Sequence, residues 1–299
     1  MNKAATTCFL TALCWLGASL TVQAQVKNIV VWNQLVSHPN QMVPQLLQRA
    51  LEVTAQQYGD VNLIPSEAME QGRLIRHMSS KPLIQVAVFG PTQQRERDAI
   101  AVRFPVTATL LSHRVCLIKA GRQAQFNGIS GLHSLLESGI TIGQHQDWPD
   151  TAILEANGIN VWKSNKYSLL FDQLNVGRFD CFARGANEVV QEQVAHSFKN
   201  IVTEQSFVVY YPFPLFFFVN KAHPELAKRI ELGLHELQSS GEFKRLFNTH
   251  FARTLNELNL AERNYLELKN PFLTPETEAA MQKYRDVFQP LIFANNHLQ

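Results

Sequence analysis

The stretch LLFDQLNVGRFDCFARGANEV, residues 169–189, places a helix, a glycine and an apolar strand in direct succession. Together with the residue just before the stretch, the helical face consists of Tyr167, Leu170, Phe171 and Leu174, at helical spacing. Gly177 ends this helix, and the apolar run after it is typical of a buried strand. A helix that leads into a buried strand indicates an α/β fold. The strand ends on Arg184, which predicts either a salt bridge or a ligand contact there.

The same alternation of apolar runs and helical patterns continues along the chain in two series. In the first series three strand-like runs alternate with two helical patterns, an order that favours a parallel sheet with right-handed crossovers. The strand-like runs of both series are residues 28–32, 61–65, 83–90, 114–120, 140–143, 159–163 and 178–183. Because the pattern restarts after Phe104, the sequence predicts two α/β units of similar size.

Composition and motifs argue against several classes of function. The 299 residues carry a formal net charge of +2 and no stripe of Lys or Arg, so we expect no nucleic-acid binding. The sequence has no His-x-x-x-His or Cys-x-x-Cys spacing, no Gly-x-Ser-x-Gly motif and no Gly-rich phosphate loop. We therefore expect no metal site, no cofactor and no serine hydrolase activity.

Residues 1–24 have the pattern of a secretory signal peptide. Lys3 supplies a positive charge, an apolar run follows over residues 9–20, and a Val-Gln-Ala cleavage site ends the segment. A lipoprotein signal at Cys14 is the alternative, but Leu13 is unfavourable directly before a lipidated cysteine. We therefore expect an exported, periplasmic protein.

Two cysteines remain after the predicted signal peptide, Cys116 and Cys181, and both lie in apolar, strand-like runs. Such positions favour two buried free thiols. A disulfide is the alternative, because an exported protein meets an oxidising compartment. It requires the two strands to be neighbours, which the sequence does not establish.

Three segments, in the right order behind a signal peptide, resemble bacterial periplasmic solute-binding proteins of family 3, the polar amino-acid type. The segments are GLHSLLESGITIGQHQDWPDTAILEANG (131–158), LNVGRFDCFARG (174–185) and FFFVNKAHPELAKRIELGLHELQSSGEFKRLFNTHF (216–251). The resemblance implies a divergent member with an α/β, two-lobed, type II periplasmic binding protein-like fold. Each lobe would be a mostly parallel sheet flanked by helices.

The resemblance also implies how the chain is divided between the lobes. Residues 26–110 and 213–299 would form lobe 1, including a C-terminal helical extension, and residues 111–212 would form lobe 2. Two crossing strands would join the lobes, which close on a ligand by a hinge motion. The tail from about residue 253 is longer than the resemblance requires, and we expect it to pack on lobe 1.

On the lobe 1 side, the resemblance points to the segment GPTQQRERD, residues 90–98. Family members carry Thr-x-x-Arg here, and Thr92 and Arg95 fit that spacing, so Arg95 would hold a ligand carboxylate. Arg97 and Arg103 are the rival arginines, and a solvent-facing charged turn is the alternative to any ligand role. Trp32 follows the first strand, where it either lines the cleft or packs in the core.

On the lobe 2 side, the position of the family's ammonium-binding acid falls on Gly185, beside Arg184. An arginine there favours a carboxylate or phosphate, which it can hold with two hydrogen bonds. The alternative is an ion pair between Arg184 and Glu188. In the segment QHQDWPDT, Asp147 or Asp150 would cap a helix whose N-terminus also attracts anions.

Trp148 lies in the same segment, where it either stacks on a ligand or fills the edge of the lobe.

The resulting prediction is a non-enzymatic, monomeric protein that captures a small polar ligand, anionic or amino-acid-like, for a membrane permease or a sensor. One alternative is an enzyme on the same fold, similar to the dehydratases of cyclic acids among the family's relatives. Its acid or base candidates would be Asp150, Glu188 and His145. Another alternative is a module with a degenerate cleft that binds a protein partner.

Overall fold

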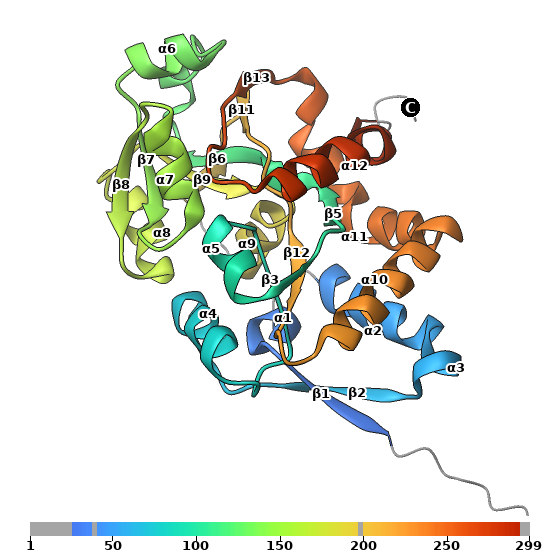
Figure 1. Cartoon of the computed structure of the whole chain (residues 1–299). Helices are drawn as coiled ribbons and strands as arrows, with labels where there is room; N and C mark the ends of the chain where they lie inside the picture. The colour runs from blue at the N-terminus through green and yellow to red at the C-terminus, as the bar shows by residue number, and fades with distance from the viewer. Residues whose placement is uncertain (1–25, 38–40, 197–199, 294–299) are drawn as a thin grey trace, which may run out of the picture.

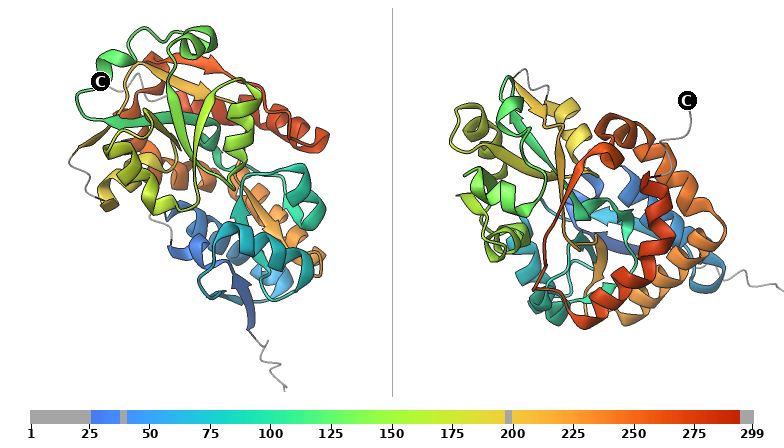
Figure 2. Two further views of the ribbon diagram at one scale, coloured as in Figure 1. Left: turned by 90° about the vertical axis from the view of Figure 1, so that its left-hand side faces the viewer. Right: turned by 90° about the horizontal axis from the view of Figure 1, so that it is seen from above.

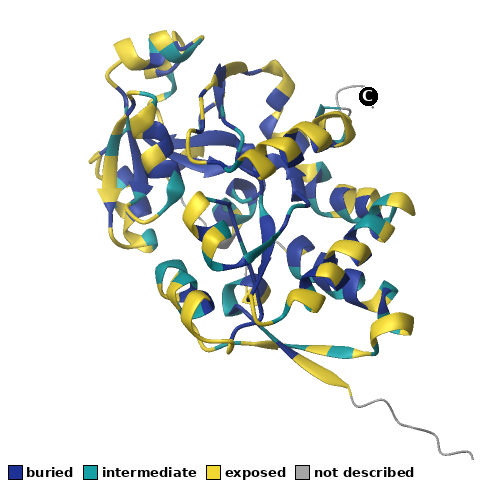
Figure 3. Ribbon diagram, in the orientation of Figure 1, coloured by how far each residue is buried: buried dark blue, intermediate teal, exposed yellow. Residues whose placement is uncertain are grey.

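Two β-sheets, each flanked by helices, divide the chain into two lobes (Figure 1). The computed structural model describes residues 26–37, 41–196 and 200–293. The predicted signal peptide, with the alternative lipidation site at Cys14, therefore lies outside the described residues. The buried residues follow the strands and the inner faces of the helices, as Figure 3 shows. The predicted two-lobed α/β architecture is confirmed.

The first sheet has the strand order β2-β1-β3-β12-β4 and defines the first lobe. Its strands are β1 (Lys27–Val31), β2 (Val61–Pro65), β3 (Val86–Phe89), β4 (Ile100–Val102) and β12 (Phe216–Val219). β1 pairs in parallel with β2 and β3, whereas β12 runs antiparallel to both β3 and β4. The late strand β12 thus closes a sheet that begins at the N-terminus.

The second sheet has the order β13-β11-β6-β9-β7-β8, with β10 also paired to β6, and defines the second lobe. Its strands are β6 (His113–Lys119), β7 (Thr141–His145), β8 (Asn160–Ser164), β9 (Cys181–Gly185), β10 (Ile201–Thr203), β11 (Phe207–Tyr210) and β13 (Asn264–Glu267). β6 runs antiparallel to β9, β10 and β11, and the other pairs are parallel.

The strand directions correct the expectation of mostly parallel sheets, because both sheets are mixed. Parallel neighbours follow from helical crossovers within one sheet. β6 and β12 instead enter their sheets as the chain passes between the lobes, so no crossover helix sets their direction. Short segments make these passages, one around β5 (Val106–Thr109) and one between β11 and β12.

Helices cover both sheets, as the views in Figure 2 show. The α-helices are α1 (Asn33–Ser37), α2 (Met42–Val53), α3 (Ala55–Tyr58), α4 (Gln71–Ser80), α5 (Gln93–Asp98), α6 (Leu132–Glu137), α7 (Pro149–Ala156), α8 (Tyr167–Asn175), α9 (Val189–His196), α10 (Pro224–Ser239), α11 (Glu242–Leu258) and α12 (Pro275–Phe293). Three short 3₁₀ segments are Leu110–Ser112, Gln123–Gln125 and Leu260–Glu262. Within the described ranges, no helix is both long enough and apolar enough for a membrane crossing.

The stretch that opened the sequence analysis folds as predicted. Helix α8 buries Leu170, Phe171 and Leu174, and it ends before Gly177, whose φ of 76° suits a residue without a Cβ. All five residues of β9 are buried, because this strand lies between β6 and β7 in the second sheet. Arg184 therefore lies near the end of a central strand of the second sheet.

Cys116 and Cys181 form a disulfide, so the expectation of two free thiols is wrong. Their strands, β6 and β9, are antiparallel neighbours, and the two Cα atoms lie 5.1 Å apart. The two cysteines are 65 residues apart in sequence, and only the strand pairing brings them together.

The C-terminal tail packs on the first lobe, as expected, but its strand β13 belongs to the second lobe, which corrects the assignment of all of residues 213–299 to lobe 1. Its strand β13 pairs in parallel with β11 and extends the second sheet. Its helix α12 then packs Tyr284 and Phe288 against Phe104 and Phe243 of the first lobe.

Candidate functional site

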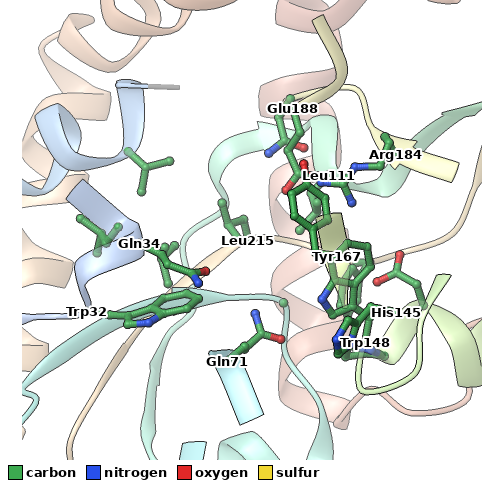
Figure 4. Close-up of a pocket in the computed structure, with 18 of the residues that line it drawn as sticks. Trp32, Gln34, Gln71, Leu111, His145, Trp148, Tyr167, Arg184, Glu188 and Leu215 are labelled. Carbon is green, nitrogen blue, oxygen red and sulfur yellow. Dashed lines mark ion pairs between the residues drawn. The ribbon is translucent and has the colours of Figure 1, made fainter. Parts of the chain in front are cut away.

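A cavity of about 390 Å³ lies between the two lobes. The first lobe contributes the end of β1, the start of α4 and helix α5, through Trp32, Gln71 and Arg95. The second lobe contributes the starts of β6, α7 and α8 and the ends of β7 and β9. From these elements, the lining includes Arg114, His145, Trp148, Asp150, Tyr167 and Arg184. Figure 4 shows labelled side chains from both lobes converging on this space.

Arg95 lies in this cavity as a buried cation. Its guanidinium donates to the carbonyl oxygen of Gly90 at 2.7 Å and to Oε1 of Gln71 at 2.6 Å, and both acceptors are neutral. Among the described residues, no carboxylate forms an ion pair with Arg95. Burial lowers its pKa to about 10, although the more distant charge of Asp150 acts in the opposite direction. Glu70 also lines this side of the cavity, but Arg95 itself has no direct counterion within the described ranges.

Arg184 also lines the cavity, but two carboxylates compensate its charge. Its nitrogens lie 2.9 Å from Oε2 of Glu188 and 2.8 Å from Oε2 of Glu192. The Glu188 contact is the ion pair that the sequence analysis gave as the alternative to a ligand role. Burial opposes the charge of Arg184, yet the two carboxylates hold its pKa well above the ordinary value.

A second compensated arginine, Arg114, was missed by the sequence analysis. It is the second residue of β6, forms an ion pair with Asp150 at 2.7 Å and donates from Nε to the hydroxyl of Tyr211 at 2.9 Å. The Tyr211 hydroxyl in turn donates to Asp150. Burial raises the pKa of Tyr211 well above its usual value, so the phenol keeps this proton. An arginine at one end of a buried strand, as at Arg184, was the signal that could have indicated Arg114.

Asp150 does not cap helix α7, which corrects the prediction that Asp147 or Asp150 would do so. The residue at the N-cap is Trp148, and no side chain caps the helix. Asp150 lies in the first turn, where its carboxylate pairs with Arg114 across the lobe.

Aromatic side chains form opposite walls of the cavity. Trp32 is 4% exposed and donates its indole N–H to the carbonyl of Met69 at 3.0 Å. Across the cavity, Trp148 lies with its ring 4.8 Å from the guanidinium carbon of Arg184 and 5.9 Å from the ring of Tyr167. Figure 4 shows Trp32 on one side and Trp148 with Tyr167 on the other. Both predicted tryptophans thus line the cavity, and Tyr167 joins them.

Thr92 and Arg103, both named in the sequence analysis as candidates, are not among the residues that line the cavity. The Thr92 hydroxyl accepts from the backbone N–H of Arg95 at 3.2 Å and caps helix α5. The guanidinium of Arg103 donates to Glu96 at 2.6 Å. The rival Arg97 donates to Gln94 in an exposed contact. Arg95 is therefore the arginine of this segment that reaches the cavity.

The side chains named for the enzymatic alternative are already engaged. Asp150 is held by Arg114, and Glu188 by Arg184. His145 accepts from the backbone N–H of Asp147 at 3.2 Å through Nδ1, so Nε2 donates to the carbonyl of Asn165 at 3.1 Å. Among the described residues, no group of His, Cys, Asp or Glu could hold a metal ion.

No protein-family model matches the chain, and no curated protein matches it. Solved structures do match. An ancestral arginine-binding protein bound to arginine gives a TM-score of 0.54 at 17% identity, over 75% of this chain and 98% of that chain. A structure from work on glutathione import in Streptococcus mutans gives 0.56 at 10% identity, over 76% of this chain and 95% of that chain.

An ancestral amino-acid-binding protein, described as a precursor of cyclohexadienyl dehydratase, gives a TM-score of 0.52 at 13% identity, over 75% of this chain and 95% of that chain. At such identities the likeness shows the fold. The chain has the fold of these solute-binding proteins, and about a quarter of its own length lies outside the matches.

Proposed function

We propose that this chain is an exported solute-binding protein that captures a small amino-acid-like molecule between its lobes and presents it to a membrane permease or a sensor. The observation that carries the proposal is Arg95, a buried guanidinium in an interlobe cavity with neutral hydrogen-bond partners. A carboxylate of the ligand would supply the missing counterion and accept two hydrogen bonds from it.

The charges of the opposite wall favour an amino group elsewhere on the ligand. That wall carries two guanidiniums, Arg114 and Arg184, and three carboxylates, Asp150, Glu188 and Glu192, so its formal charge is 2 − 3 = −1. Glu188 is the most exposed of these carboxylates, with 19% of its side chain accessible. A molecule with a carboxylate toward Arg95 and an ammonium toward Glu188 would match both walls.

The aromatic walls would hold the remaining part of the ligand. Trp32 on the first lobe and Trp148 on the second offer flat apolar surfaces to a side chain between them. The cavity volume, about 390 Å³, is in the range of small-molecule sites. Because each lobe supplies only part of the contacts, closure of the lobes would complete the site.

Export is supported by the disulfide between Cys116 and Cys181, because such bonds persist in oxidising compartments. Together with the signal-like segment over residues 1–24, it favours a periplasmic location.

A thermal-shift panel of the twenty amino acids, dicarboxylates and sugars tests the proposal. A ligand present at a hundred times its Kd should raise the melting temperature by about 5 °C. Stabilisation by an amino acid without turnover is the expected result. Turnover of a ligand would indicate the dehydratase-like alternative. Binding of a sugar alone, or of no compound, would overturn the proposal, and the latter would favour the partner-binding alternative.

A further inference from the structure

The first part of the C-terminal tail is bonded to the second lobe. After β13, the backbone N–H of Leu268 donates to the carbonyl of Tyr210 at 2.7 Å, which continues the pairing with β11. The side chain of Asn157, at the end of α7, then donates to the carbonyl of Lys269 at 2.8 Å and accepts from its N–H at 3.0 Å. From Asn264 to Lys269, the tail is therefore part of the second lobe.

The next part of the tail is bonded to helix α5 of the first lobe. The backbone N–H of Gln93 donates to the carbonyl of Phe272 at 3.3 Å. The Glu96 carboxylate, with 4% of its side chain exposed, accepts from the hydroxyl of Thr277 at 2.7 Å and from that of Thr274 at 3.0 Å. Because Glu96 directly follows Arg95, these bonds hold helix α5, which carries Arg95 into the cavity.

Only Asn270 and Pro271 lie between these two attachments. Asn270 donates to the carbonyl of Pro212, in the passage between the lobes, at 2.8 Å and accepts from the N–H of Phe272 at 3.1 Å. A segment this short spans at most about 11 Å when fully extended, so it has little slack. In Figures 1 and 2 the segment after β13 runs from the second lobe to α12, which packs on the first.

We propose that residues 264–277 are a further connection between the lobes, which limits their opening and positions α5, with Arg95, relative to the second lobe. Glu96, Thr274 and Thr277 are the positioning residues of this connection. The restraint itself does not depend on the proposed ligand. Its meaning for binding rests on the proposed function, because Arg95 is the group it positions.

Distances between the lobes in the empty protein test the restraint without any ligand. Arg73→Cys on α4 and Ser168→Cys on α8 introduce exposed labelling sites on opposite lobes. Cys8→Ser and Cys14→Ser remove the other two free cysteines of the sequence. Nitroxide labels at the new sites then report the interlobe distance by pulsed electron–electron double resonance. The test variant has three glycines inserted after Pro271, which adds up to about 10 Å of slack. The insertion separates Asn270 from Phe272 and so breaks the hydrogen bond between them, but it keeps the residues that bond to each lobe.

The matched control has three glycines inserted after Gly121, an exposed turn within the second lobe. We expect the Pro271 insertion to broaden the distance distribution toward longer values, and the control to leave it unchanged. Thr277→Val, which keeps the chain length but removes a bond to Glu96, should give a smaller change of the same sign.

An unchanged distribution in both folded test variants, with melting temperatures near that of the parent, would overturn the proposal. For any ligand found by the thermal-shift panel, the Pro271 insertion should weaken binding severalfold. If no compound of the panel binds, the distance measurement still tests the restraint. The failure of one proposal can therefore be distinguished from the failure of the other.

Discussion

At the scale of single residues, Arg95 separates ligand binding from folding. Arg95→Ala should abolish ligand-induced stabilisation, because it removes the cation that we expect to hold the carboxylate. The melting temperature of the empty protein should change by no more than about 2 °C, since the two hydrogen bonds lost go to neutral acceptors and a costly buried charge is removed with them.

Arg97→Ala is the matched control, because Arg97 lies on the same helix but makes only an exposed contact. Arg97→Ala should leave the melting temperatures of the empty and the ligand-bound protein unchanged. If Arg95→Ala instead lowered the melting temperature of the empty protein by much more than this control, the residue would be structural.

Unlike Arg95, Arg184 should contribute to the stability of the empty protein, because its charge is compensated by carboxylates within the protein. Arg184→Ala would leave Glu188 and Glu192 facing each other without their cation. We expect the free energy of unfolding to fall by about 3 to 5 kcal/mol, as is usual when one partner of a buried ion pair is removed. Denaturation with guanidinium chloride measures the loss.

Arg122→Ala provides the comparison, because the ion pair between Arg122 and Asp180 is largely exposed and should contribute less than about 1 kcal/mol. Equal losses in the two variants would contradict the assignment of Arg184 as a buried structural cation.

His113 should make stability depend on pH. The pKa of this histidine is lowered from 6.5 to about 4, mainly by burial; a hydrogen bond to the carbonyl of Thr109 opposes this shift, and the charge of Arg114 contributes to it. Between these pH values the unfolded chain binds the proton more readily, so folding stability is lost as pH falls from 6.5 toward 4. The loss should approach about 3 kcal/mol.

Urea denaturation at pH 7 and pH 4.5 measures this effect. His113→Phe should reduce the difference between the two pH values, because the variant has no imidazole to protonate. The same pH difference in both proteins would show that other groups cause it.

The site residues that the sequence could indicate were those with a local pattern. Arg95 was implied by the resemblance of Thr92 and Arg95 to the family's Thr-x-x-Arg spacing, and Trp32 by its place after the first strand, where family members line the cleft. For Arg114 the position near one end of a buried strand was such a signal, but its partners, and those of Tyr211, lie 36 to 97 residues away and could not be found in this way. The short segment after β4 also gave no means to tell that Arg103 pairs with Glu96 outside the cavity.

At the scale of elements, periodicity predicted α8, but it could not predict how closely helices approach. Gly233 on α10 lies against α2, where an added Cβ would be 2.0 Å from the carbonyl oxygen of Ala50. Gly233→Ala must therefore push the helices apart, and we expect it to destabilise the protein by about 1 to 3 kcal/mol.

Gly72→Ala is the control within another helix. An added Cβ at Gly72 meets no atom closer than 3.9 Å, so the substitution should stabilise α4 by about 0.5 to 1 kcal/mol. Opposite signs of the two changes in urea denaturation are the expected result. Stabilisation by both would mean that α10 and α2 can separate without cost.

Strand direction and strand partners depend on contacts that are far apart in sequence. The apolar run of β6 indicated a strand, but nothing local showed that it runs antiparallel to β9. The same limit left the pairing of Cys116 with Cys181 open. It also hid β13, a strand of four residues, NYLE, of which only Leu266 is buried.

At the scale of the whole molecule, the two-lobed architecture was predictable because the alternation of strands and helices occurs twice. The contacts that join the two lobes could not be predicted. One buried apolar cluster contains Ile29 of the first sheet together with Leu117, Leu170 and Val208 of the second lobe. The tail adds a further contact between the lobes through β13 and α12. These shared contacts predict that the lobes unfold together.

The disulfide offers a test of this cooperativity, because it lies wholly within the second lobe. Cys116→Ala with Cys181→Ala should lower the free energy of unfolding by about 4 kcal/mol, from the 65-residue separation of the bonded cysteines. Because the lobes share a core, both sheets should lose stability together. Amide hydrogen exchange of β3 and β7 measures one sheet each, and both should show faster exchange. Loss of protection in β7 alone would mean that the lobes unfold independently, and that the shared cluster does not couple them.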